Sequence, residues 1–411
     1  MVFHCRLFWR MTLRSVFRTA GTHAPLNRKR AGFLVFYYIV WTSLAIAAWI
    51  GMLLDEILFR AYRRQPVDKP LFILSNHRSG STFLLRTLAK DAATFSSTKA
   101  ADIYLMPSVF QRKAFALFAR MDRLIGSRGE RALRKLDARL LGKVKIHPIS
   151  MFDAEEDEDL LILAWRSFLL CFPFPFLEEM PPYQYFDTAI PHAERRRIMG
   201  FYRALVQRHM YAQRHMLSCG ARHYLSKNPL FSAKIESLLE TFPNARIVYL
   251  VRNPLEMVPS TVSLFGYAWQ YFADPPEPYP RRDEILAWAR YWYDHPLEVI
   301  DRDTTGRCMI VKYDDLVRQP DRIMREIYTQ FGYEQSPALD ALLQQAAASA
   351  KTYRSDHRYS LDQLGLSRER IVSEFAHIFE RFGFSTGIEE GRNSDGMEEP
   401  EAALLTVPSM P

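Results

Sequence analysis

The sequence contains few cysteines, and no two of them are close together in the sequence. Four occur among 411 residues, and they stand far apart: Cys5, Cys171, Cys219 and Cys308. No two of them have the short separation of a cysteine pair that binds a metal ion. We therefore expect ordinary reduced thiols, and the cysteines do not indicate a cellular compartment.

The globular part of the chain lacks the excess of basic residues that is typical of nucleic-acid binding. The formal net charge is +8, but residues 1–30 contain seven arginines and lysines and no acidic residue. Subtracting 7 from 8 leaves +1 for the rest of the chain. Because the basic residues are concentrated in a terminal arm, we expect no nucleic-acid partner.

The chain also lacks an internal repeat, and after residue 70 short apolar runs alternate with helical patterns. Strands are predicted for residues 71–75, 224–227, 246–251 and 309–312, each followed by a helical stretch. This alternation predicts an α/β fold, with a P-loop-like parallel β-sheet flanked by helices. The mostly helical stretches 130–215 and 268–300 are expected to be insertions that shape an acceptor site.

The first 30 residues have the pattern of a basic amphipathic helix. Arginines recur at every fourth position and would form one stripe on a helix: Arg6, Arg10, Arg14 and Arg18. This pattern is typical of an element that lies on a membrane surface. A disordered or processed targeting arm has a similar composition and is the alternative.

Residues 33–54 then form a run of 22 uncharged residues that ends at Asp55 and Glu56. As a helix the run would be about 33 Å long, enough to cross a hydrocarbon core of about 30 Å. Basic residues flank it on both sides, so charge does not orient it in a membrane. We expect membrane association, through a helix that either spans the bilayer or lies in its interface. The alternative is a buried helix, packed on the domain or inside a homodimer.

Residues 71–84 are the most distinctive segment of the chain. The apolar strand Leu71–Ser75 leads into Asn-His-Arg-Ser-Gly-Ser-Thr and then into a helical pattern. A basic residue, a glycine and hydroxyls at a helix N-terminus form a cradle for phosphate. The glycine–lysine pair of a nucleoside-triphosphate loop is missing, which disfavours ATP and a nucleotide kinase. A glycerolipid acyltransferase would need an aspartate five positions after His77, where the chain has Thr82.

A second anion site is indicated where the predicted strand 246–251 ends. Arg252 follows this strand and precedes an Asn-Pro pair that suits the start of a helix. Ser260 lies two turns along and can add a hydroxyl, and Pro259 is expected to kink the helix. Together with the first loop, Arg252 predicts a ligand that carries two separate anionic groups.

The two segments resemble the signatures of sulfotransferases that use 3′-phosphoadenosine 5′-phosphosulfate (PAPS), in the bacterial and tyrosylprotein sulfotransferase branch. In that family the first loop binds the 5′-phosphosulfate and the second binds the 3′-phosphate. Segments 224–229, 312–317 and 357–366 are similar to further motifs of the branch, in the same order. The resemblance implies PAPS as the co-substrate, no metal, and these donor-binding residues: Arg78, Ser79, Gly80, Ser81, Thr82, Arg252 and Ser260.

The resemblance spans residues 70 to about 385 and suggests how the chain is organised. We divide it into a basic amphipathic arm, a membrane-associated or transmembrane helix, a sulfotransferase domain and an acidic disordered tail. Six acidic residues and one basic residue among positions 389–411 indicate the tail. The expected boundaries of the four parts are 1–30, 31–56, 70–387 and 388–411.

The resemblance also implies which residues act in the transfer. Arg78 would hold the donor together with loop 79–82, and Lys227, by resemblance, would approach the sulfuryl and bridging oxygens. A base must take the acceptor's proton. The branch uses a carboxylate about twenty residues after the first loop, which points to Asp102. His77 is a second candidate by position alone. The acidic run 153–159 resembles another segment of the branch, but most of it is expected to be a solvated helix start.

The predicted reaction moves a sulfuryl group from PAPS to a hydroxyl of an acceptor that the sequence does not identify. A lipid or glycolipid hydroxyl is favoured over a carbohydrate, and a protein tyrosine comes third. The reason is the apolar N-terminus together with an insert rich in phenylalanine: Phe168, Phe172, Phe174 and Phe176. The alternative function is a catalytically silent, membrane-anchored nucleotide-binding protein of the same fold.

Overall fold

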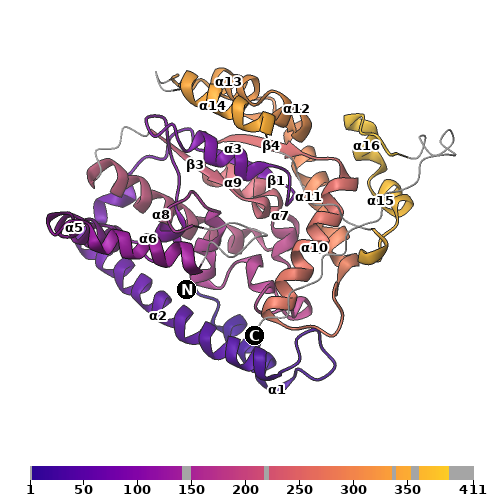
Figure 1. Ribbon diagram of the computed structural model, residues 1–411, viewed down its shortest axis with the longest axis horizontal. Helices are drawn as coiled ribbons and strands as arrows, with labels where there is room; N and C mark the ends of the chain where they lie inside the picture. Colours follow the sequence, from indigo (N-terminus) through magenta and orange to yellow (C-terminus); the bar gives the residue numbers. More distant parts are fainter. Residues whose placement is uncertain (1, 141–149, 217–221, 336–338, 353–360, 388–411) are drawn as a thin grey trace.

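The computed structural model of the chain describes residues 2–140, 150–216, 222–335, 339–352 and 361–387. Parallel strands form its central sheet, in the order β2-β3-β1-β4-β5. The predicted α/β class, a parallel sheet flanked by helices, is confirmed (Figure 1). The strands are β1 (Leu71–Ser75), β2 (Phe95–Ser96), β3 (His223–Lys227), β4 (Arg246–Val251) and β5 (Cys308–Lys312).

The middle strands of the sheet are buried on both faces, which explains their continuous apolar sequences. On one face, Leu71 and Ile73 of β1 pack with helices α3, α13 and α14. On the other face, Phe72 and Leu74 pack with α8, α9, α10 and α11. These helices are α3 (Ser81–Leu88), α8 (His192–Met216), α9 (Ile235–Thr241), α10 (Pro254–Phe272), α11 (Arg282–Asp301), α13 (Pro320–Phe331) and α14 (Leu339–Thr352).

The first loop, Lys227 and Arg252 follow strands β1, β3 and β4 and lie at the carboxyl end of the sheet. Because all the strands run in the same direction, the segments after β1, β3 and β4 emerge at their shared carboxyl ends. The register places Ile73 opposite Lys227 and Ser75 opposite Leu250. The carboxyl end of the sheet therefore brings together segments that are about 170 residues apart in the sequence.

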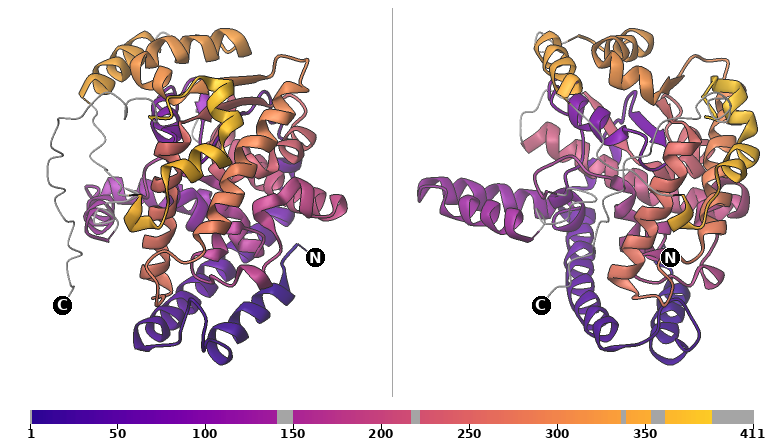
Figure 2. Two further views of the ribbon diagram at one scale, coloured as in Figure 1. Left: turned by 90° about the vertical axis from the view of Figure 1, so that its right-hand side faces the viewer. Right: turned by 45° about the vertical axis from the view of Figure 1, so that its right-hand side comes forward.

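The expected insertion 130–215 is helical at both ends but not in its middle. Residues 157–185 form short 3₁₀ turns, beginning with η2 (Asp157–Ala164). In the second half of this segment Pro173, Pro175, Pro181 and Pro182 exclude a longer helix. Before it, α5 (Val109–Leu124) and α6 (Arg128–Leu140) form a helical hairpin that projects from the body (Figure 2). Shorter helices of the domain are α4 (Ala100–Tyr104), α7 (Phe186–Ala189), α12 (Tyr313–Arg318), α15 (Arg368–Glu374) and α16 (Ala376–Phe382).

The N-terminal region forms two helices, α1 (Cys5–Phe17) and α2 (Arg28–Leu58), on the side of the molecule opposite α13 and α14 (Figures 1 and 2). The predicted apolar helix is confirmed, and by length and composition α2 could cross a membrane. The arginine stripe of α1 is only partly exposed, because Arg14 forms ion pairs with Glu178 and Glu179 of the domain at 3.6 and 3.2 Å. The arm thus packs on the domain.

Three sequence predictions lie wholly or partly outside the described residues: the cysteine at position 219, the first four residues of the motif 357–366, and the acidic tail from residue 388. Pro259, the residue predicted to kink a helix, lies inside α10, and this helix continues beyond it to Phe272.

Candidate active site

The first loop has a backbone that only certain residues can adopt. Arg78 and Gly80 have φ angles of +62° and +78°, and α3 begins directly after the loop at Ser81. A Cβ atom on Gly80 would lie 2.8 Å from the ring of Tyr313, far inside van der Waals contact. Glycine is therefore required here both by backbone conformation and by the close approach of Tyr313.

The two predicted anion-binding segments are directly connected. The Arg252 Nη1 donates a hydrogen bond to the carbonyl oxygen of Arg78 at 2.6 Å, and Arg78 Nε donates to Ser260 Oγ at 3.1 Å. The guanidinium of Arg252 also lies over the Tyr313 ring, 4.3 Å from its centroid. The structure thus brings together Arg78, Arg252 and Ser260, and adds Tyr313 as the side chain that packs between the two loops. All four residues line one cavity.

Lys227 lies at the end of β3, and its ammonium group forms an ion pair with Glu156. Lys227 is 3% exposed, and both residues line the same cavity as the first loop. A lysine that is buried at a strand end and paired with a carboxylate beside an anion site can stabilise developing negative charge. Glu156 is a site residue that the sequence reasoning named only as part of an acidic run.

The interpretation of that acidic run as a solvated helix start is wrong. Asp157 and Glu158 are completely buried. Asp157 accepts hydrogen bonds from the Tyr224 hydroxyl at 2.6 Å and the Ser226 hydroxyl at 2.8 Å, and burial raises the pKa of Asp157 to about 6. Glu158 pairs with Lys234, and burial raises the pKa of Glu158. The run is a buried connector that fixes Glu156 at the cavity wall.

Asp159, the next carboxylate of this segment, faces the cavity together with Tyr104, whose hydroxyl donates to it. Burial raises the pKa of Asp159 well above its usual range. Together these two residues give the cavity a second polar pair, which the sequence reasoning also missed.

The structure does not bring Asp102 to this site. Its carboxylate accepts a hydrogen bond from the Lys99 backbone N–H at 2.9 Å and forms an ion pair with Arg112 at 2.7 Å. Asp102 is 6% exposed and does not line the cavity. Both carboxylate oxygens are thus engaged in holding the start of α4. The other base candidate, His77, does line the cavity, and its ring packs against Phe265 and Trp292 with centroids 5.5 and 5.3 Å apart.

The cavity has a volume of about 1530 Å³ and two chemically different ends. One end contains the first loop, Lys227 and Arg252. The other end is apolar and aromatic and reaches the inner face of α2. Its lining residues include Phe33, Tyr37, Trp41, Ile162, Leu169, Phe172, Leu264 and Phe272. A single cavity of this size is larger than most small-molecule sites and has room for two ligands end to end.

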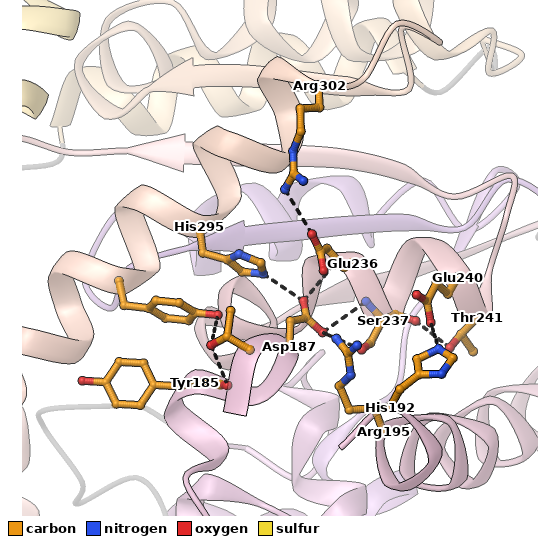
Figure 3. Close-up of polar contacts among 12 residues, drawn as sticks. Tyr185, Asp187, His192, Arg195, Glu236, Ser237, Glu240, Thr241, His295 and Arg302 are labelled. Carbon is orange, nitrogen blue, oxygen red and sulfur yellow. Dashed lines mark hydrogen bonds and ion pairs between the residues drawn. The ribbon is translucent and has the colours of Figure 1, made fainter. Parts of the chain in front are cut away.

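A separate cluster around Asp187 has the residue types of a metal site but serves a structural purpose (Figure 3). Asp187 accepts hydrogen bonds from the backbone N–H groups of Glu236 and Ser237, at 2.9 and 3.2 Å. It also pairs with Arg195 at 3.3 Å and with His295 at 3.0 Å. Since the carboxylate caps α9 and lies outside the cavity lining, we assign this cluster to the packing of α7, α9 and α11.

Comparison with known proteins agrees with this geometry. The sequence model of the Sulfotransferase family matches residues 70–337, which include the first loop, Lys227 and Arg252. The chain belongs to the sulfotransferase family. The sulfotransferase STF9 from Mycobacterium avium has the same fold, with a TM-score of 0.69 at 19% identity over 94% of this chain and 98% of that protein. STF1 from Mycobacterium tuberculosis H37Rv gives 0.63 at 17% identity, over 92% and 94%.

Sequence similarity to curated sulfotransferases is more local. The chain is 27% identical over 163 residues to the omega-hydroxy-beta-dihydromenaquinone-9 sulfotransferase Stf3 of Mycobacterium bovis, and equally to that of Mycobacterium tuberculosis. The match covers 38% of this sulfotransferase and 40% of each relative.

Proposed function

We propose that this sulfotransferase moves the sulfuryl group of PAPS to a hydroxyl on a long, apolar acceptor. The observation that carries the proposal is the single cavity, which joins the first loop, the buried Lys227 and the half-buried Arg252 to an aromatic chamber. An acceptor with a polar end and a hydrocarbon body fits both halves of this cavity. The name of the Stf3 relatives, which gives an omega-hydroxylated dihydromenaquinone as acceptor, supports the same class.

In the proposed donor site, the loop 78–82 holds the 5′-phosphosulfate with its backbone N–H groups and the hydroxyls of Ser81 and Thr82. Arg252 and Ser260 hold the 3′-phosphate. Because Arg252 Nη1 donates to the Arg78 carbonyl, binding at the second site also fixes the backbone of the first. The two phosphate groups of the nucleotide would thus be held by one connected unit.

In the proposed transfer, the acceptor oxygen attacks sulfur while the bond from sulfur to the bridging phosphate oxygen breaks. Lys227 meets the negative charge that develops on the departing phosphate, and Arg78 holds the sulfuryl oxygens. The hydroxyl proton passes to the carboxylate of Glu156, which becomes available when the Lys227 ammonium turns to the donor. The products are a sulfate ester and 3′-phosphoadenosine 5′-phosphate (PAP).

The proposal is tested by donor specificity and acceptor chain length. Calorimetry should show that PAP binds the purified protein at least about tenfold more tightly than ATP, since the site is matched to two separate phosphates. Release of PAP from PAPS should be faster with a long-chain ω-hydroxy lipid in micelles than with a short alcohol. Equal affinity for ATP would contradict the donor assignment. Binding of PAP without any turnover would instead favour a silent nucleotide-binding protein.

A further inference from the structure

Large exposed apolar side chains are confined to one region of the described structure. All of the strongly exposed large apolar residues lie on α1, α2, the α5–α6 hairpin, positions directly next to these helices, or the end of α10. Soluble proteins rarely expose contiguous apolar patches of this extent unless the patch binds something. On α2 the exposed large apolar residues, called here the outer face, are Val35, Phe36, Ile39, Val40, Ile46, Ile50, Leu53, Ile57 and Leu58.

The opposite face of α2 is bound to the domain along its whole length. In the first turn, Arg30 is buried and donates to the carbonyl oxygens of Phe272 and Pro173, at 2.8 and 3.1 Å. In the middle, the Trp41 ring packs on Trp165 with centroids 5.6 Å apart. In the last turn, the buried Asp55 pairs with Arg208 at 2.9 Å.

These contacts decide between the two membrane arrangements. To cross a bilayer, α2 would have to leave the domain, and the separation would strand the buried charges of Arg30, Asp55 and Arg208 without their partners. A helix that lies along the domain instead keeps every one of these contacts and exposes only its outer face. The structure thus favours an in-plane helix over a spanning one.

The charge of the neighbouring helices indicates what covers the outer face. Residues 109–140, which form the α5–α6 hairpin, contain nine basic and three acidic residues, a net charge of +6. Residues 1–30 add +7, so 8 minus 13 leaves −5 for the remainder of the chain. A surface that combines exposed apolar side chains with excess positive charge matches an anionic lipid leaflet. A second copy of the chain would bring two positive surfaces together.

The cavity opens next to this surface. Phe33, Tyr37 and Trp41 on the inner face of α2 line its apolar end. Tyr267 and Tyr271 of α10 line the same end and are 46% and 60% exposed, so the cavity meets the surface between α2 and α10. The Phe33 ring contacts Phe272 of α10 with centroids 5.1 Å apart, at the edge of this opening.

We propose that α2 lies in the plane of one anionic leaflet, flanked by α1 and the α5–α6 hairpin, and that a lipid acceptor enters the cavity sideways from that leaflet between α2 and α10. The entry route rests on the proposed function; the membrane orientation does not. The helix is then at once the membrane contact and a wall of the acceptor site.

Vesicle binding tests the surface. Full-length protein should float with vesicles that contain phosphatidylglycerol and much less with pure phosphatidylcholine, and added salt should weaken the binding. The variant Ile39→Glu/Ile50→Glu, on the outer face, should bind at least about tenfold more weakly. The matched control Thr329→Glu/Ala341→Glu adds the same charges at exposed positions of α13 and α14 and should bind like the wild type. Unchanged vesicle binding of the outer-face variant would overturn the proposal. So would a dimer that forms without lipid and buries Ile39 and Ile50 in its interface.

Labelling of single cysteines tests the orientation. In a protein with Cys5 and Cys219 replaced by serine, Arg28→Cys and Leu58→Cys mark the two ends of α2, and Ile46→Cys marks its exposed middle. In intact vesicles a membrane-impermeant maleimide should label both ends, while the middle becomes protected relative to protein in solution. Protection of one end only would show a spanning helix and overturn the proposal.

Activity separates this inference from the proposed function. The outer-face variant should sulfate a detergent-dispersed short acceptor at the wild-type rate and lose activity only toward lipid acceptor embedded in vesicles. Equal loss with both acceptors would overturn lateral entry. A protein that binds vesicles as predicted but transfers no sulfuryl group to either acceptor would refute the proposed function and leave the membrane orientation standing.

Discussion

Lys227 at the end of β3 and Glu156 at the start of the buried acidic segment form an ion pair on the wall of the cavity. In sequence the two residues are 71 positions apart, and only the fold makes them neighbours. The proposed chemistry depends on this pair, because one member can stabilise the leaving phosphate and the other can take the acceptor's proton.

Replacement of Glu156 by glutamine should lower kcat about 100-fold or more while leaving the affinity for PAP nearly unchanged, because glutamine cannot accept the proton. Steady-state kinetics, together with calorimetry of PAP binding, would check this. A matched control is Glu158→Gln, which removes a fully buried carboxylate of the same segment and should lower the melting temperature. If Glu156→Gln keeps full activity, His77 becomes the leading candidate for the base.

Arg252→Ala should weaken PAP binding about tenfold to 100-fold, since one charge-assisted interaction with phosphate is lost. The dependence of affinity on salt should also become shallower. Arg302→Ala is the control, because Arg302 is an exposed arginine that pairs with Glu236 outside the cavity. Calorimetry at two salt concentrations would measure the PAP affinity of both variants. An unchanged PAP affinity of Arg252→Ala would refute the assignment of Arg252 to the 3′-phosphate.

Gly80→Ala should abolish donor binding, because the new Cβ would press on the Tyr313 ring and push the loop away from the phosphosulfate. Gly126→Ala is a strict control: its φ is +84°, close to the +78° of Gly80, but nothing lies within 4 Å of its Cβ position. The control should therefore carry only the cost of placing an L-residue in the left-handed region, about 1–2 kcal/mol. Comparison of PAP affinity and melting temperature would separate strain from collision, and equal behaviour of the two variants would refute the packing argument.

His209 should make the protein sensitive to acid. It is buried, its Nε2 lies 2.7 Å from Ser96 Oγ, and burial lowers the pKa of His209 to about 3. The unfolded chain protonates this histidine near pH 6.5 and the folded chain does not. The contribution of neutral His209 to the free energy of unfolding is therefore fully present above pH 6.5 and is lost as the pH is lowered toward 3. At about 1.4 kcal/mol for each pKa unit, the loss amounts to several kcal/mol. Urea unfolding at pH 4.5 and 7 should show a smaller loss for His209→Gln than for the wild type; parallel losses would contradict the assignment.

Local pattern predicted β1, β3, β4 and β5 but not the short β2, and it drew attention to the first loop and Arg252, because these signals are contiguous in the sequence. The strand 71–75, the glycine of the first loop and Arg252 at the end of β4 each sit beside their own helix start, so composition and order revealed them. The carboxylate that lines the cavity, Glu156, could not be singled out in this way. Asp102 has the expected spacing from the first loop, but its pairing with Arg112 depends on how α5 packs.

The acidic run shows the same limit. Charge alone suggests solvent exposure, whereas hydroxyls of Tyr224 and Ser226 on β3 stabilise Asp157 inside the protein. The role of α2 also became visible only in three dimensions, because sequence periodicity does not reveal that Phe33 and Trp41 line a cavity while Ile39 lies outside it.

The most direct test of the central claim is the transfer of radiolabelled sulfate from PAPS to a long-chain ω-hydroxy lipid by the purified protein. We expect labelled lipid and an equal amount of PAP with the wild type. The Lys227→Ala variant, which loses the group that meets charge on the leaving phosphate, should still bind PAP but form labelled lipid at least about 100-fold more slowly. Wild-type protein that binds PAP and forms no labelled lipid, or a Lys227→Ala variant as fast as the wild type, would contradict the account.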